Sequence, residues 1–277
     1  MQIGKLTTHG PDLKMFIYGF TGAGKTHFAG TALDMDIMRP VLFVNTDHGQ
    51  LTLLDRADDD GLIQVIPKDY IELRQVVISQ RRDKYPAFTE AVAKSGLVLP
   101  KDGFRTLILD DLSSTHWLAL MKVIGYSVSD REAKGKDRSE DIAELGDYGR
   151  ARIWMHKLLN ELRSLPMHVI VTAKAERVRD ETTGKLITQP LLFGKVTHEA
   201  GAFFDFVGLL TAVEAKQEED LVIRRRLYWA LGDRADGKER LGLPGSFLEN
   251  PSVAKIFNRS TRLQTLLKEQ ANAADQS

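Results

Sequence analysis

The chain has 277 residues, of which 43 % are hydrophobic and 27 % are charged, proportions that are ordinary for a folded globular protein. Lysine plus arginine and aspartate plus glutamate each number 38, so the net charge does not demand a polyanionic partner. The absence of cysteine excludes disulfides, thiolate metal sites and thiol nucleophiles, and it fits a reducing compartment. No stretch reaches the ~18 apolar residues of a membrane helix, so we expect no membrane partner and a cytoplasmic location.

Short apolar runs alternate with longer segments of helical spacing, which is typical of βαβ units around a mostly parallel sheet. The expected strands are Lys14–Tyr18, Pro40–Asn45, Leu62–Ile66, Phe104–Asp110 and His168–Thr172. The expected helices are about Lys25–Asp34, Asp69–Arg82, His116–Ile124 and Tyr148–Leu165. Two later apolar runs, joined by a charged turn, indicate an antiparallel hairpin formed by Phe203–Val213 and Leu221–Leu231.

Three polar segments have no apolar face that a core could bury. Ser127–Asp141 is strongly charged, and we expect it to be a mobile surface loop. Glu176–Gly184 is also polar and is expected to be a loop, and Glu269–Ser277 is expected to fray. We therefore expect one domain over residues 1–260, followed by a helix end and tail over residues 261–277.

Residues 19–26, with the sequence GFTGAGKT, match the phosphate-loop pattern G-x-x-x-x-G-K-[ST] in full. The glycines let backbone N–H groups wrap a phosphate, and the following helix adds the positive end of its dipole. We expect Lys25 to reach the β- and γ-phosphates of ATP and Thr26 to ligate Mg²⁺. The alternative is a glycine-rich turn with a solvent-facing lysine, which the flanking strand and helix disfavour. The expected nucleotide contacts are Gly19, Phe20, Thr21, Gly22, Ala23, Gly24, Lys25, Thr26 and His27.

Two carboxylates end the apolar run TLILDD, where a phosphate loop needs an acid for its magnesium shell. Asp110 follows the strand directly and is the expected metal acid, while Asp111 or Ser113 is suited to cap the next helix. Hydrolysis also needs a group that orients the attacking water. Asp47, which follows the second expected strand, is favoured for this role; Asp111 is the alternative, and a simple turn is another role for Asp47.

With these parts placed, the chain resembles the RecA-like branch of P-loop ATPases. More closely, it resembles the phage-encoded RecA-type proteins that include the Sak-type single-strand-annealing ATPases. The similarity spans about residues 14–257 and rests on GFTGAGKT, VLFVNTDHG, TLILDD, DYGRARIWMHKLLNELRSLPMHVIVTAKAE and GKERLG. The resemblance implies a RecA-like α/β core, ATP and Mg²⁺ as ligands, and recombination in a phage-infected or prophage-carrying bacterial cell.

The resemblance also implies roles for individual residues. Asp47 stands where these proteins have a catalytic carboxylate, usually Glu, and the shorter side chain argues against fast hydrolysis. Thr172 stands at the γ-phosphate-sensing position, although the common Gln is absent. Lys238 and Arg240 resemble the Lys-x-Arg pair that reaches a neighbouring subunit's γ-phosphate, which implies self-association into a ring or filament. The alternative for this pair is a solvated charge cluster in a loop.

Single-stranded DNA is the partner that the resemblance implies, bound through loops that follow the sensing strand. Acidic residues are interspersed among the basic residues there, and an ordinary solvated loop is the alternative. In the later hairpin, strand alternation would place Arg224, Arg226 and Tyr228 on one face of the strand. The alternatives for what this face meets are DNA, another subunit and solvent. The candidate nucleic-acid contacts are Lys174, Arg177, Arg179, Lys185, Lys195, Arg224 and Arg226.

Three other functions stay open at this point. One is a helicase or motor ATPase of DNA replication or packaging, and another is an ATP-binding switch with negligible turnover. The third is a small-molecule or nucleoside kinase, for which Ser127–Asp141 is the lid candidate. Stimulation of ATP hydrolysis by single-stranded DNA would separate the DNA-linked functions from a kinase.

Overall fold

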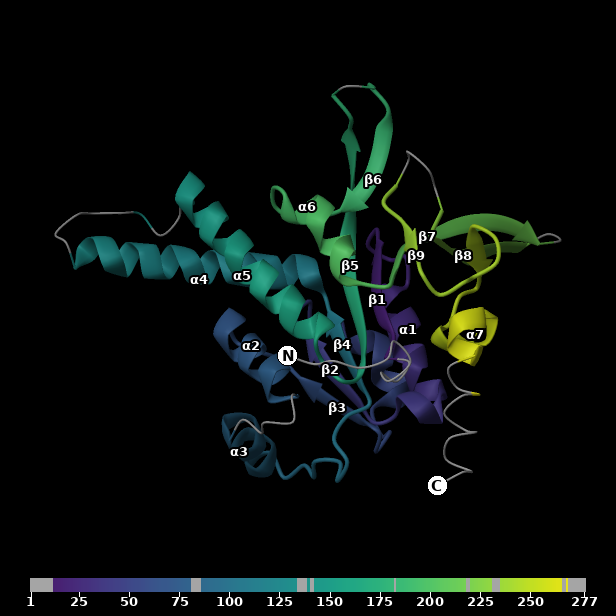
Figure 1. Ribbon diagram of the computed structural model, residues 1–277, viewed down its shortest axis with the longest axis horizontal. Coiled ribbons are helices and arrows are strands. Elements are labelled where there is room, and N and C mark those ends of the chain that lie inside the picture. The colour runs from purple at the N-terminus through teal and green to yellow at the C-terminus, as the bar shows by residue number, and fades with distance from the viewer. Residues whose placement is uncertain are drawn as a thin grey trace.

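The computed structural model describes residues 12–80, 86–133, 139, 142–181, 183–217, 220–230, 235–265 and 268. Within these ranges, ten strands form a sheet with a parallel centre (Figure 1). The strands are β1 (Lys14–Gly19), β2 (Val41–Asn45), β3 (Leu62–Val65), β4 (Thr106–Asp110), β5 (His168–Arg179), β6 (Leu186–Pro190), β7 (Phe206–Gln217), β8 (Asp220–Tyr228), β9 (Lys238–Glu239) and β10 (Phe247–Glu249). The α-helices are α1 (Lys25–Gly30), α2 (Tyr70–Ser79), α3 (Pro86–Lys94), α4 (Leu112–Glu132), α5 (Leu145–Arg163), α6 (Val196–Glu199) and α7 (Val253–Arg259). Short 3-10 helices are η1 (Thr31–Asp34), η2 (Asp36–Met38), η3 (Gln50–Arg56) and η4 (Ala200–Phe203).

The strands follow the order β10-β8-β7-β1-β5-β4-β2-β3, with β6 paired to β5 and β9 paired to β7. β1 is parallel to both of its neighbours, so that Lys14 lies opposite Val169 and Met15 lies opposite Phe206. β5 separates β1 from β4, and the phosphate loop and Asp110 therefore come from strands that are not adjacent. The mostly parallel α/β sheet predicted from the sequence is confirmed.

Helices cover both faces of the sheet, as parallel strands require (Figure 1). Phe16 and Tyr18 of β1 belong to a core that also contains residues of α2, α4 and α5, whereas Met15 and Ile17 belong to the core that contains residues of α1 and α7. This alternation follows the period of a strand whose two faces are both buried. The phosphate loop therefore starts from a strand that is held on both faces.

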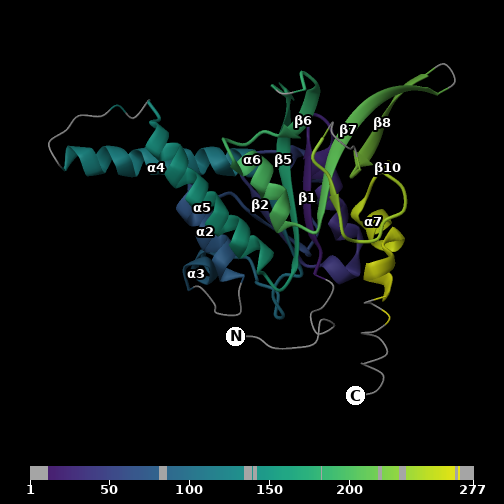
Figure 2. The ribbon, with the colours of Figure 1, turned by 45° about the horizontal axis from the view of Figure 1, so that its top comes forward.

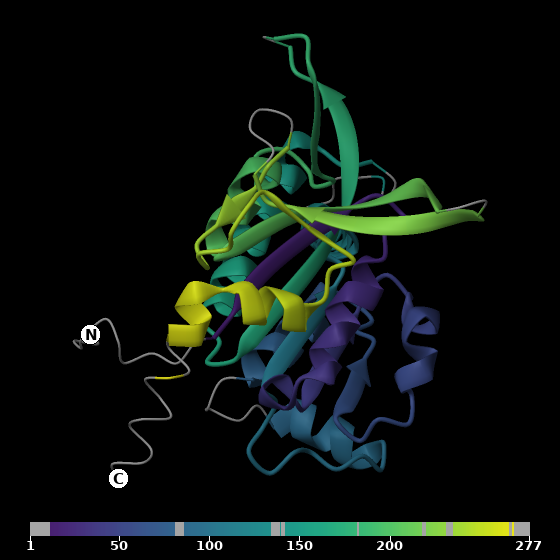
Figure 3. The same cartoon turned by 90° about the vertical axis from the view of Figure 1, so that its right-hand side faces the viewer.

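Two hairpins extend beyond the helical layers, and Figures 2 and 3 show them from different sides. The predicted antiparallel hairpin is present as β7 and β8, with Leu209 opposite Tyr228. The other hairpin corrects a prediction, because Glu176–Gly184 was expected to be a loop and its first residues belong to β5. Arg179 lies opposite Leu186 of β6, and this pairing satisfies backbone groups without an apolar face to bury.

The predicted loop Ser127–Asp141 is wrong at its start, because α4 continues through Glu132. Ser127 donates a 2.8 Å hydrogen bond from Oγ to Oδ1 of Asp147 in α5. Val128 is buried in a small core between α4 and α5. These contacts with another helix extend α4 beyond the apolar stripe that indicated a helix only over His116–Ile124.

The C-terminal division into residues 1–260 and 261–277 stays a prediction. α7 buries Val253, Ile256 and Phe257 in the core shared with α1. The expected frayed tail, along with residues 134–138, 140 and 141 of the expected loop, lies outside the described residues. Among the helices of the described ranges, none combines the length and the apolar composition that a bilayer crossing demands.

His116 lies in the first turns of α4, is only 2 % exposed, and accepts a 3.2 Å hydrogen bond at Nδ1 from the Phe193 N–H. Burial lowers its pKa to about 4, whereas an unfolded chain binds this proton below about pH 6.5. Stability that is present above about pH 6.5 is therefore lost as the pH falls toward 4. The wild type should therefore lose free energy of unfolding between about pH 7 and about pH 4.5. We expect His116→Gln to lose about 2 to 3 kcal/mol less over this interval, as measured by urea unfolding at the two pH values.

The matched control is His198→Gln, at an exposed position. It is expected to lose as much stability as the wild type over the same pH interval. Equal losses in all three proteins would show that His116 does not carry this pH dependence.

Candidate nucleotide-binding site

The phosphate loop joins the end of β1 to the start of α1. Gly22 (φ 79°) and Gly24 (φ 93°) adopt the left-handed conformation that glycine tolerates. A Cβ atom on Gly22 would meet nothing within 4 Å, so this part of the backbone is open to a ligand. The Lys25 ammonium lies across the start of the loop and donates to the carbonyls of Gly19 (3.0 Å) and Phe20 (3.2 Å). Burial lowers the pKa of Lys25.

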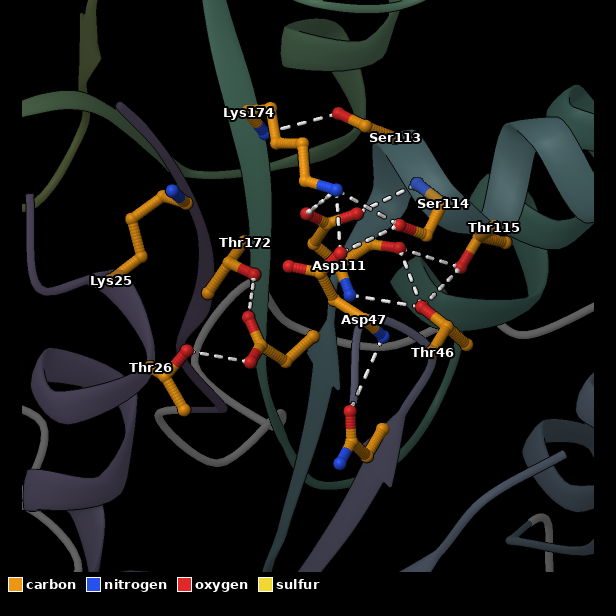
Figure 4. A network of polar contacts seen from close by, with 12 residues as sticks. Lys25, Thr26, Thr46, Asp47, Asp111, Ser113, Ser114, Thr115, Thr172 and Lys174 are labelled. Carbon is orange, nitrogen blue, oxygen red and sulfur yellow. Dashed lines mark hydrogen bonds and ion pairs between the residues drawn. The ribbon is translucent and has the colours of Figure 1, made fainter. Parts of the chain in front are cut away.

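Asp110 is buried at the end of β4 and accepts hydrogen bonds from two hydroxyl groups, those of Thr26 and Thr172, which are labelled in Figure 4. Thr26 Oγ1 donates to Oδ2 over 2.7 Å, and Thr172 Oγ1 donates to Oδ1. The first hydroxyl comes from the phosphate loop and the second from β5, the strand between β1 and β4. Burial raises the pKa of Asp110. Thr26, Asp110 and Thr172 were each singled out from the sequence, and in the structure both threonines contact Asp110 directly.

Asp47 lies just after β2 with a side chain that is 38 % exposed (Figure 4). Its Oδ1 accepts from the Lys174 ammonium at 2.5 Å and from Ser114 Oγ at 3.1 Å. Its backbone N–H donates to the Asp110 carbonyl at 3.3 Å, which holds the turn after β2 against the end of β4. A carboxylate that is accessible and close to Asp110, the candidate metal acid, can orient a water molecule once Lys174 leaves it.

Asp111 is almost fully buried and caps helix α4. Its Oδ1 accepts from the Ser114 N–H at 2.7 Å, and its backbone N–H donates to Thr46 Oγ1 at 2.9 Å. Burial raises the pKa of Asp111 to about 6. The two neighbouring carboxylates therefore differ in environment, with one facing Thr26 of the phosphate loop and the other serving as a helix cap.

A cavity of about 440 Å³ opens in front of these residues. Its lining combines the phosphate loop, the carboxylates of Asp47 and Asp110, and Lys174, which pairs with Asp47. The lining residues are Thr21, Gly22, Gly24, Lys25, Thr26, His27, Asp47, Gly49, Thr52, Asp110, Lys174 and Arg225. Gly49, Thr52 and Arg225 were missed from the sequence. For Arg225 the only available signal was strand alternation. It places Arg225 on the opposite face of the strand from Arg224 and Arg226, but it does not indicate which residues that face contacts.

The residues that hold Mg²⁺ in a site of this kind are oxygen ligands, and the Thr26 hydroxyl and Asp110 carboxylate supply that chemistry. Thr26 Oγ1 and Asp110 Oδ2 lie 2.7 Å apart and both residues line the cavity, so these two oxygen groups fit a magnesium ion. In the described ranges, no group of three or more His, Asp or Glu residues is placed to hold a metal. Phosphate oxygens and water would therefore complete the coordination of an ion at this position.

Lys238 and Arg240 do not line the cavity. The Lys238 ammonium donates to the carbonyls of Gly201 (3.2 Å), Ala202 (3.2 Å) and Phe204, at the C-terminal end of η4. Arg240 has a 55 % exposed side chain, and its guanidinium lies 3.9 Å from Asp205. In the single chain, therefore, Lys238 caps a turn, whereas Arg240 points to the surface.

The candidate nucleic-acid residues are spread over two hairpins and the start of α6. Lys174 belongs to the cavity, and the Arg177 guanidinium lies 5.2 Å from the centre of the Phe20 ring in the phosphate loop. Arg226 pairs with Glu249 at 2.7 Å. The other members are exposed in the β5–β6 hairpin (Arg179, Lys185), at the start of α6 (Lys195) and half-buried on β8 (Arg224).

The chain is similar to solved structures of other proteins. Two solved structures from archaea are similar to the chain: a KaiC-like protein of Pyrococcus horikoshii OT3 and the flagellar accessory protein FlaH of Methanocaldococcus jannaschii. Their identities are 14 % and 13 %, with TM-scores of 0.42 and 0.39. The alignments cover 86 % of this chain and 88 % of the first, and 84 % of this chain and 83 % of the second.

The RadB recombinase is also similar, at 16 % identity and a TM-score of 0.41, with 87 % of each chain covered. No curated protein matches the chain. The family described as "AAA domain" matches residues 12–241, which include the phosphate loop, Asp47, Asp110, Thr172 and Arg225. The chain belongs to the AAA domain family of P-loop proteins.

Proposed function

We propose that the protein binds ATP with Mg²⁺ and hydrolyses it slowly. The observation that carries the proposal is the direct contact between Thr26 of the phosphate loop and Asp110, at the edge of a cavity large enough for a phosphate chain. Loop N–H groups and Lys25 bind the phosphates, and Thr26 and Asp110 hold the ion, which neutralises phosphate charge when bound. The test is release of inorganic phosphate from ATP by the purified protein, with and without Mg²⁺.

Asp47 is proposed to orient the attacking water, with Thr172 sensing the terminal phosphate. The pairing of Asp47 with Lys174 supports slow turnover, because the carboxylate must exchange this 2.5 Å contact for one with water. The same pairing favours a second candidate, a nucleotide-dependent switch. A turnover far below that of ordinary ATPases, together with tight ATP binding, would identify the switch.

Asp47→Asn is expected to lower the rate of ATP hydrolysis roughly 100-fold, which is the lower range for loss of a group that directs proton transfer. Affinity for ATP should change by less than about 3-fold, because the side chain contributes no contact to the phosphate loop. The measurement is a steady-state phosphate-release assay beside titration with a fluorescent ATP analogue. The control is Asp58→Asn, an exposed residue outside the cavity; unchanged turnover in Asp47→Asn would exclude this role.

The finer proposal is work on single-stranded DNA in phage recombination, in the bacterial cytoplasm, by subunits joined in a ring or filament. Lys238 and Arg240 then act on the nucleotide of a neighbouring subunit, for which Lys238 must leave its carbonyl contacts. The exposed basic residues of the β5–β6 hairpin support a DNA contact. A single-stranded oligonucleotide that fails to bind the ATP-loaded protein, or to change its turnover and assembly, would exclude this part while leaving ATP hydrolysis intact.

A further inference from the structure

Arg225 lies directly on the phosphate loop. It belongs to β8, and its side chain lines the cavity beside Lys25 and Thr26. A Cβ atom placed on Gly24 would lie 2.5 Å from Nε of Arg225 and 2.9 Å from its Cδ. The Arg225 side chain therefore covers Gly24, and a larger residue at that position would have to displace it.

Within the part of the chain that the structure describes, the charged group of Arg225 has no counter-ion. Its Nε atom is buried and makes no hydrogen bond to any described residue. No described carboxylate forms an ion pair with this side chain, whereas Arg226 next to it pairs with Glu249. A buried donor without an acceptor is costly in a folded protein, and an arginine in this state is suited to receive an anion.

The backbone of Arg225 is fixed from both sides of β8. The Asn250 N–H donates to the Arg225 carbonyl at 2.7 Å, and the Arg225 N–H donates to Asn250 Oδ1 at 3.5 Å. On the other edge, Arg225 pairs in register with Ala212 of β7, which lies beside β1. The side chain is thus presented to the loop by a held strand rather than by a free loop.

The order of the strands indicates which part of a nucleotide Arg225 meets. β8 lies on one side of β1, whereas the strands that carry Asp47, Asp110 and Lys174 lie on the other side. The terminal phosphate belongs near the carboxylates and the metal, where hydrolysis takes place. Arg225 therefore faces the inner part of the phosphate chain, away from the reacting end.

We infer that Arg225 binds the α- or β-phosphate of the nucleotide held by its own chain, a role that rests on the proposed nucleotide site. This contact is made in the same subunit, so it is separate from the Lys238 and Arg240 pair proposed to act on a neighbour. Because ADP and ATP share these phosphates, Arg225 contributes to the affinity for both. It also links the β7–β8 hairpin to the bound nucleotide.

The test is titration of fluorescent ADP and of a non-hydrolysable fluorescent ATP analogue into Arg225→Ala, Arg225→Lys and wild-type protein. Loss of a charge-assisted contact is expected to weaken both nucleotides by a similar factor, roughly 10- to 100-fold in Arg225→Ala. Arg225→Lys should recover part of the affinity, because lysine keeps the charge without the planar fork. The control, Arg259→Ala at an exposed site on α7, should bind as the wild type does.

Thermal unfolding without nucleotide separates binding from a purely structural role. Arg225→Ala should unfold at the same temperature as the wild type or higher, because it loses an unpaired buried donor, while its stabilisation by ADP shrinks. A lower unfolding temperature with unchanged ADP affinity would overturn the inference, and so would weakened binding of the ATP analogue alone. If the wild type binds neither nucleotide, the proposed function itself fails. If the wild type and Arg225→Ala bind equally well, only the role of Arg225 fails.

Discussion

Lys25→Ala is expected to reduce ATP binding by roughly 100-fold or more and to abolish measurable hydrolysis. The Lys25 ammonium donates hydrogen bonds to two carbonyls at the start of the phosphate loop. It therefore lies over the loop, within reach of a bound phosphate. Removing it takes away the cation that the phosphate loop itself supplies to the β- and γ-phosphates, which would lie beside the carboxylates of Asp47 and Asp110. Calorimetric titration with ATP and a phosphate-release assay measure the two effects.

The control for this change is Lys157→Ala, at an exposed position on α5. It should bind and hydrolyse ATP as the wild type does. The circular dichroism spectrum of Lys25→Ala should match that of the wild type, since the deletion removes only two hydrogen bonds of the loop. Wild-type hydrolysis by a folded Lys25→Ala protein would contradict the whole site.

Asp110→Asn is expected to remove the gain in ATP affinity that Mg²⁺ provides and to lower turnover by roughly 100-fold or more. The amide keeps one oxygen for a hydroxyl of Thr26 or Thr172 but lacks the negative charge that holds the ion shell. Titrations with excess Mg²⁺ and with excess EDTA give the measurement. The wild type should differ between the two conditions, whereas Asp110→Asn should bind ATP equally in both.

Loss of folding cannot produce this pattern. Because burial raises the pKa of Asp110, a neutral amide is expected to leave the free protein at least as stable as the wild type at neutral pH. Asp102→Asn, in an exposed loop, is the control and should retain the full effect of Mg²⁺. If Asp110→Asn also retained that effect, another residue would have to be the metal acid.

Much of the parallel core could be predicted because its signals are local. Each apolar run such as Pro40–Asn45 is long enough for one strand, and the helical stripes between the runs demand crossover connections. The extra length of α4 was missed because it depends on contacts with α5, and the pairing of Arg179 with Leu186 was missed because neither segment carries an apolar pattern of its own. The short strands β9 and β10 and the helix α7 were missed as well, since their segments are too short for a periodic pattern.

The site shows the same division between local and distant signals. The phosphate loop and Asp110 are each written in a few consecutive residues, and the Thr26 contact follows once the strands are parallel. Arg225 could not be found in this way, because its role depends on β8 lying two strands from β1. Lys174 and Arg177 stay candidate DNA contacts, and the structure adds neighbours that the sequence did not predict: Lys174 lines the cavity and Arg177 lies over Phe20.

The position of β1 in the sheet has a consequence for synthesis of the protein. Both strands that flank β1 come late in the sequence, and Lys14 meets its partner Val169 only after about 150 further residues have been translated. At roughly 5–20 residues per second, the strand that feeds the phosphate loop waits roughly 8–30 s for a neighbour. During that time the apolar residues of β1 stay exposed on the nascent chain, where a chaperone has time to bind them.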